Sequence, residues 1–127
     1  MPAEHTYDYA IIRLVPRVER GELINVGVIL SCPAADFLEA RIDLNSSRLL
    51  ALDPSLDVDA ARAHLGVIPR VCRGGPDAGA LGGLPQRSRF HWLVSPRSTI
   101  IQMSPVHTGR TDDPGKTLQR LLDTMVR

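Results

Sequence analysis

Residues 7–44 read YDYAIIRLVPRVERGELINVGVILSCPAADFLEARIDL, and apolar and polar side chains alternate in three parts of this stretch. The alternation covers residues 7–15, 23–31 and 37–44, and it is most regular in the third segment. A period of two is typical of β-strands that bury one face. Short connections that contain proline or glycine separate the segments, so neighbouring strands should pair antiparallel. The stretch therefore predicts an antiparallel meander.

Two later segments carry apolar residues at helical spacing. The first stripe should end at Pro69, and the second follows Asp113 and Pro114, which suit the cap and the first position of a helix. The stripes consist of Val58, Ala61, Leu65 and Ile68, and of Leu118, Leu121, Leu122, Met125 and Val126. We expect residues 45–52 to form no more than a short turn before the first helix.

Residues 90–94 and 97–103 are predicted to form a last pair of strands. Between the first helix and this pair lies GGPDAGALGGLP, residues 74–85, which lacks the Gly-Lys-Ser/Thr ending of a phosphate-binding loop and is expected to be a glycine-rich loop. Taken together, these elements predict a single α+β domain over residues 1–127. Its antiparallel sheet has about five strands, and two helices pack on one face.

The composition fits one globular domain, with 127 residues of which 43% are hydrophobic. Net charge is −4 over residues 1–66, which hold six arginines and ten acids, and +5 over residues 67–127, which hold nine basic residues and four acids. The basic half could attract carboxylates or phosphates. An overall charge of +1 and an aromatic content of 4% argue against nucleic-acid binding.

The N-terminal residues, the apolar runs and the cysteines indicate the cellular compartment. The N-terminal MPAEHTYDY shows no signal-peptide pattern, and no apolar run approaches the ~18 residues that span a bilayer. Cys32 and Cys72 are too far apart for a CxxC pair, so we expect two buried, reduced thiols. The sequence thus predicts a cytoplasmic protein with no membrane association, no metal and no cofactor.

The segment RFHWLVSPRSTIIQMSPVHTG, residues 89–109, is the first candidate for a functional surface because hydrogen-bonding side chains are concentrated there. Its candidate binding residues are His91, Arg97, Thr99, Gln102, Ser104 and His107. These side chains could bind a phosphate or carboxylate with a histidine as acid or base. Alternatively, the hydroxyl groups could only close turns beside the prolines. Arg13 and Asn25, expected on neighbouring strands, form a second candidate patch.

Catalytic patterns are missing from the sequence. It contains no GxSxG elbow, and Ser31-Cys32-Pro33 matches no cysteine-protease signature. We therefore assign no catalytic residue and leave open whether the protein is an enzyme.

Three segments resemble a bacterial family known as domain of unknown function 3037 (DUF3037). They are residues 7–30, residues 48–54 (RLLALDP) and residues 89–109, and the resemblance extends over nearly the whole chain. Ser104 stands where similar sequences are expected to carry threonine. The resemblance implies no activity; it implies an accessory role beside a HipA-like kinase protein.

Two functional hypotheses follow. In the first, the protein is a non-enzymatic interaction module that binds a protein partner, such as a HipA-like kinase protein, through a sheet edge or face. A homodimer formed through an edge strand is part of this hypothesis. In the second, the protein is a small-molecule- or phosphate-binding enzyme or sensor that uses residues 89–109.

Overall fold

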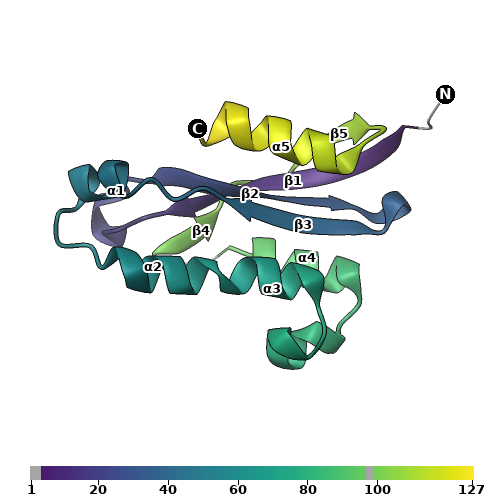
Figure 1. Ribbon diagram of the computed structural model, residues 1–127, viewed down its shortest axis with the longest axis horizontal. Coiled ribbons are helices and arrows are strands. Elements are labelled where there is room, and N and C mark those ends of the chain that lie inside the picture. The colour runs from purple at the N-terminus through teal and green to yellow at the C-terminus, as the bar shows by residue number, and fades with distance from the viewer. Residues whose placement is uncertain (1–3, 97–98) are drawn as a thin grey trace.

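A five-stranded antiparallel sheet forms the centre of the protein (Figure 1); the computed structural model describes residues 4–96 and 99–127. The strands are β1 (His5–Leu14), β2 (Ile24–Cys32), β3 (Phe37–Ile42), β4 (Ile101–Met103) and β5 (His107–Thr111). Their order is β3-β2-β1-β4, and β5 also pairs with β1. Because β5 pairs with residues 5–9 of β1 and β4 with residues 12–14, the two short strands share one edge of the sheet and β3 forms the other.

The predicted meander is confirmed, with strand ends within two residues of the expected positions. Residues Asp8 to Ile12 of β1 pair with Ser31 to Gly27 of β2, and β2 pairs with β3 from Gly27 to Cys32. The register between β1 and β2 shifts at a bulge between Ile12 and Arg13.

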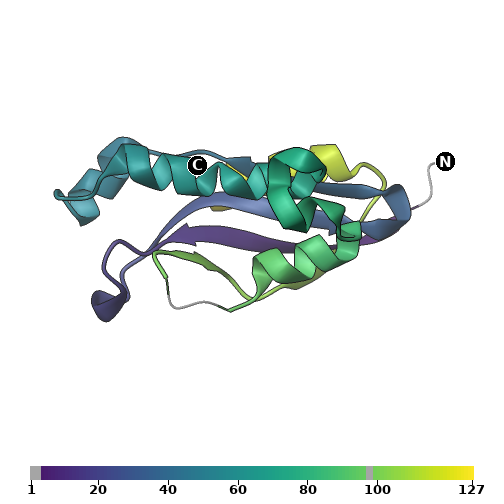
Figure 2. The same cartoon turned by 90° about the horizontal axis from the view of Figure 1, so that it is seen from below.

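Helices cover both faces of the sheet, so the predicted α+β class is confirmed but the arrangement of two helices on one face is wrong. The helices are α1 (Ser46–Leu52), α2 (Val58–Leu65), α3 (Val67–Arg73), α4 (Gln86–Val94) and α5 (Pro114–Met125). Helix α5 packs on one face, and α2, α3 and α4 pack on the other (Figures 1 and 2). The physical reason is that both faces of β2 are apolar. Val26 and Ile29 contact the layer of α2, α3 and α4, and Val28 and Leu30 contact α5.

Both predicted helical stripes form helices, and the structure adds helical residues after Pro69 and over residues 46–52. Asp113 caps α5 by accepting a hydrogen bond from the backbone N–H of Lys116. The first predicted stripe continues past Pro69, which lies in the first turn of α3, where its missing N–H costs no helical bond. Residues 45–52, expected to form a turn, contain helix α1, whose N-cap is Asn45.

The predicted strand over residues 90–94 is wrong, because this segment belongs to α4. Phe90 and Leu93 are both buried, a helical spacing that a short apolar run does not distinguish from alternation. The strand predicted over residues 97–103 is reduced to β4, and residues 97–98 lie outside the described residues. Strand β5, which was not predicted, completes the sheet.

The glycine-rich segment is held by the buried guanidinium of Arg89. Residues Pro76–Gly83 form 3-10 turns. Arg89 donates to the carbonyls of Val71 and Cys72, both at 2.7 Å, and to that of Leu84 at 3.1 Å. It thereby adds hydrogen bonds to carbonyls at the end of α3 and fixes the start of α4.

Gly27 gives a test of the close approach between β2 and β3. A Cβ at this position would lie 2.6 Å from the carbonyl oxygen of Arg41. Gly27→Ala should therefore lower the free energy of unfolding by about 1–3 kcal/mol, because the strands must move apart. Gly83→Ala is the matched control, since a Cβ there meets no atom within 4 Å. Equal urea midpoints for the two variants would contradict the packing described.

Candidate functional site

The structure separates the polar residues predicted as one site. Ser104 is buried, accepts a hydrogen bond from the backbone N–H of Ile11 at 2.8 Å and donates to the carbonyl of Pro105 at 2.9 Å. It therefore anchors the segment after β4 to β1. This contact matches the alternative in which the hydroxyls serve the fold.

The remaining predicted residues of this segment lie on several elements. His91 is exposed on α4, whereas His107 is on β5, where its ring lies 5.4 Å from that of Tyr9. Thr99 donates to the carbonyl of Ile101, and Gln102 donates to that of Thr99. Arg97 lies outside the described residues. Thus Thr99 and Gln102 are brought together, while the histidines are placed elsewhere.

Arg13 and Asn25, the second predicted patch, lie next to each other, and Asn25 contacts the end of α5. Arg13 is directly opposite Asn25 on β2 and Gln102 on β4. The Asn25 amide donates to the carbonyl of Met125 at 3.0 Å and so caps α5. The Arg13 Nε and Asn25 Oδ1 atoms are buried without a hydrogen-bond partner in the part of the chain that the structure describes.

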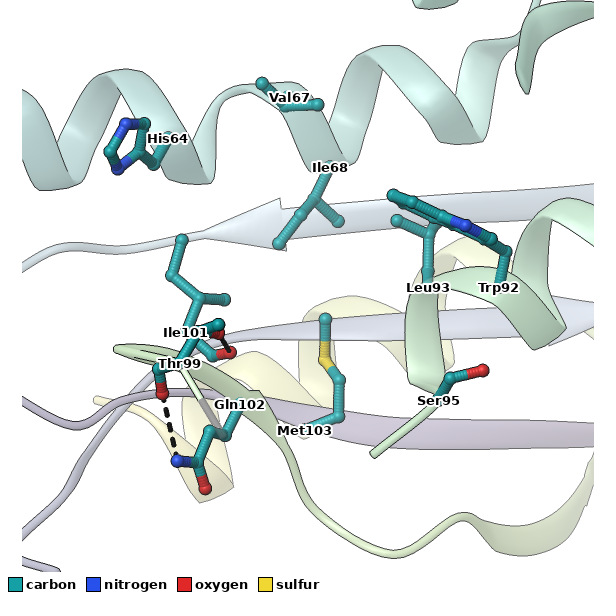
Figure 3. A pocket seen from close by; sticks show the side chains of 10 residues that line it. All are labelled: His64, Val67, Ile68, Trp92, Leu93, Ser95, Thr99, Ile101, Gln102 and Met103. Carbon is teal, nitrogen blue, oxygen red and sulfur yellow. Dashed lines mark hydrogen bonds between the residues drawn. The ribbon is translucent and has the colours of Figure 1, made fainter. Parts of the chain in front are cut away.

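An apolar pocket, called here the apolar hollow, lies between the α2–α3 layer, α4 and β4. Its volume is about 240 Å³. It is lined by His64, Val67, Ile68, Trp92, Leu93, Ser95, Thr99, Ile101, Gln102 and Met103. Figure 3 shows Ile68 from the helical layer and Met103 from β4 pointing toward the same space, with Trp92 at one side. Val67 and Trp92 remain 44% and 42% exposed, so the hollow has an accessible apolar rim.

The part of the chain that carries the hollow is rich in arginine. Residues 60–111 contain seven arginines and a single acid, Asp77. Arg62, Arg70 and Arg73 of α2 and α3 are exposed and form no ion pair within the described ranges. His64 lies at the rim. An apolar group that carries negative charge beside it would therefore fit this surface.

The arrangement favours binding over nucleophilic chemistry. Burial raises the pKa of the Cys72 thiol to about 12, so the thiol remains protonated at neutral pH. Among residues 4–96 and 99–127, no three His, Cys, Asp or Glu side chains are grouped as a metal ion would require. The lining of the hollow is dominated by aliphatic side chains, Trp92 and Met103, which hold a ligand by burial.

Sequence reasoning missed the hollow because three of its ten lining residues come from a distant segment. Of these three residues, His64, Val67 and Ile68, only Ile68 belongs to the predicted helical stripe that packs on the sheet. Val67 lies off the predicted stripe and is exposed, which was the available signal. The strand predicted over residues 90–94 also concealed that Trp92 is on the outer side of a helix.

A polar cluster around Asp8 was also missed. The Asp8 carboxylate accepts hydrogen bonds from Thr108 of β5 and from Arg87 of α4, and Arg87 also donates to Ser31 of β2 at 2.8 Å. Burial raises the pKa of Asp8, but the Thr108 and Arg87 hydrogen bonds outweigh it, and the net pKa lies below the ordinary value of 3.8. This cluster ties α4 to the sheet and so fixes one wall of the hollow.

Comparison with known proteins identifies a family. A family model described as a protein of unknown function (DUF3037) matches residues 9–126, which confirms the resemblance over nearly the full chain. No curated protein matches. No solved structure matches either. None of the helices within the described residues combines the length and apolar character needed to cross a bilayer.

Ser104→Ala tests whether this serine is a structural residue. The variant should lose about 1–3 kcal/mol of unfolding free energy, because the buried N–H of Ile11 loses its acceptor. Thr99→Ala should change stability by less than about 0.5 kcal/mol, since Thr99 is exposed. Urea denaturation of both variants provides the measurement, and an unchanged Ser104→Ala midpoint would contradict the assignment.

The depressed pKa of Asp8 predicts a pH dependence. The stabilisation is fully present above the unfolded-state pKa near 4 and is lost as the pH falls through the lower folded-state value. Asp8→Asn should therefore melt below the wild type at pH 7, and the gap should shrink as the pH approaches 2. Thermal melts from pH 7 to pH 2 test this expectation; a gap that does not change with pH would refute it.

Proposed function

The chain belongs to the DUF3037 family, and we propose that it acts as a non-enzymatic accessory module that binds a protein partner through the apolar hollow. The observation that carries this proposal is the contrast between two sets of side chains. The Ser104 hydroxyl and the Asn25 amide N–H are hydrogen-bonded within the fold, whereas Val67 and Trp92 expose apolar surface beside a concave pocket.

An apolar anchor from the partner would gain most from this site. The hollow has room for a large apolar side chain such as leucine or phenylalanine. Burying such a side chain contributes about 1.5–3 kcal/mol, and covering Trp92 adds further apolar area. Arg62 and Arg70, exposed on the helices that carry His64 and Val67, favour carboxylates beside the anchor.

The proposed partner is a HipA-like kinase protein in the bacterial cytoplasm. The family resemblance supports this choice, since it implies an accessory role beside such a protein. The hollow supplies the chemistry that the partner must match: an exposed segment with one large apolar residue flanked by acidic residues.

A small-molecule sensor is the second candidate, favoured by the concave shape of the hollow. Thr99 and Gln102 line it together with the apolar residues. Its ligand would be an apolar anion, such as an aryl or acyl carboxylate, with its charge directed toward the exposed arginines of α2 and α3.

Co-expression with the HipA-like kinase protein of the same organism tests the first candidate. The tagged wild type should retain the kinase in stoichiometric amount, and Val67→Asp should reduce the retained amount at least tenfold by placing a charge on the apolar rim. Val18→Asp is the matched control, since Val18 is also exposed, at 43%, but lies in the β1–β2 connection. Failure of the wild type to retain the kinase, or equal losses for both variants, would overturn the proposed partnership.

Titration with 1-anilinonaphthalene-8-sulfonate, an apolar anion, distinguishes the sensor function from the partner-binding function. Trp92 is the chain's single tryptophan and lines the hollow, so its emission reports occupancy. Saturable binding that Val67→Asp weakens and Val18→Asp preserves, together with absence of kinase retention, would favour the sensor over the partner module.

A further inference from the structure

The outer side of β3 presents a row of unpaired backbone groups. The N–H of Asp43 donates to the carbonyl of Val26 at 2.8 Å, which fixes the direction of the backbone at the end of β3. Because the direction alternates along an antiparallel strand, the N–H and C=O groups of Leu38, Ala40 and Ile42 point away from β2. No hydrogen bond to these groups occurs within the part of the chain that the structure describes.

The outer side of β3 lies between the two helical layers, and Leu38 and Ala40 are 8% and 7% exposed there. Seen in Figure 1, α5 runs on one side of β3 and α2 and α3 run on the other, and no element crosses the strand. The opposite edge of the sheet is divided between β4, with three residues, and β5, with five. Strand β3 is therefore the longer continuous edge, with six residues.

The charges on β3 are arranged so that the strand complements itself. Glu39 and Arg41 flank Ala40 and point to the same face, where they are 44% and 33% exposed. In an antiparallel pair of two β3 strands centred on Ala40, Glu39 of one copy is opposite Arg41 of the other. Opposite charges placed across a strand pair are favourable, and like charges are unfavourable. In the same register Leu38 is opposite Ile42 on the other face.

We propose that two copies of this chain associate through β3, antiparallel and centred on Ala40, to form one continuous sheet. Both backbone groups of Leu38, Ala40 and Ile42 then pair with the second copy. Arg41 retains its 2.7 Å hydrogen bond to Gln119. Its 3.2 Å contact with Glu39 of the same copy is replaced by, or shared with, a contact to Glu39 of the second copy. The symmetry is that of an isologous dimer.

This association uses residues other than those of the apolar hollow, so it stands or falls separately from the proposed function. A junction of six residues per strand is short, and we expect a weak dimer. Sedimentation velocity over roughly 1 µM to 1 mM covers dissociation constants in the expected range.

Charge exchange on β3 provides the sharpest experiment. Glu39→Arg and Arg41→Glu should each weaken the dimer at least tenfold, because each places like charges opposite one another. The double variant E39R/R41E restores opposite charges in the same register and should return the dissociation constant to within about threefold of the wild type. Glu22→Arg, in the β1–β2 connection, is the control and should leave dimerisation unchanged.

A backbone variant tests the hydrogen bonds directly. Ala40→Pro removes an N–H that has no partner among the described residues of one copy, so it should abolish the dimer while the far-UV circular dichroism stays that of the folded wild type. A wild type that remains monomeric at 1 mM would overturn the proposal. So would a dimer that the single charge variants leave unchanged, or a double variant that fails to recover.

Discussion

Burial of both faces of β1 and β2 is the constraint on which the rest of the structure depends. Val26 and Ile29 on one face of β2, and Val28 and Leu30 on the other, are all fully buried. Each such side chain contributes about 1.5–3 kcal/mol when it is removed from water, so neither face can be left to solvent. One amphipathic helix, α5, covers the face of Val28 and Leu30, and the chain between β3 and β4 supplies the layer that covers the face of Val26 and Ile29.

The apolar hollow follows from how that second layer is held. Arg89 links α4 to the end of α3, and Arg87 links α4 to the sheet through Asp8. These polar ties fix α4 along one part of the sheet, and the apolar hollow remains between it, the α2–α3 layer and β4. Because buried and part-buried hydrogen bonds position α4, this wall of the hollow is preorganised and needs little ordering when a partner binds.

The sequence predicted what depends on local periodicity. The first three strands, the α5 helix and its Asp113 cap follow from alternation, helical spacing and capping chemistry. It did not predict α4, because Phe90 and Leu93 fit a strand or a helix equally well over so short a run. The site was predicted least well. Asn25 lies opposite Arg13 as expected, but Ser104 is hydrogen-bonded to the backbone of Ile11 and Pro105, because whether a hydroxyl or an amide binds a ligand or the backbone depends on long-range contacts. The hollow joins α2–α3 to β4, a contact that no local pattern encodes.

The central claim is that the apolar hollow is the surface through which this protein recognises its partner. Hydrogen–deuterium exchange of the wild type, with and without the purified HipA-like kinase protein, tests this most directly. We expect slower exchange in peptides covering residues 64–68 and 92–103 and unchanged exchange in the β1–β2 connection. Binding that protects other parts of the chain and leaves both hollow peptides unchanged would contradict the claim.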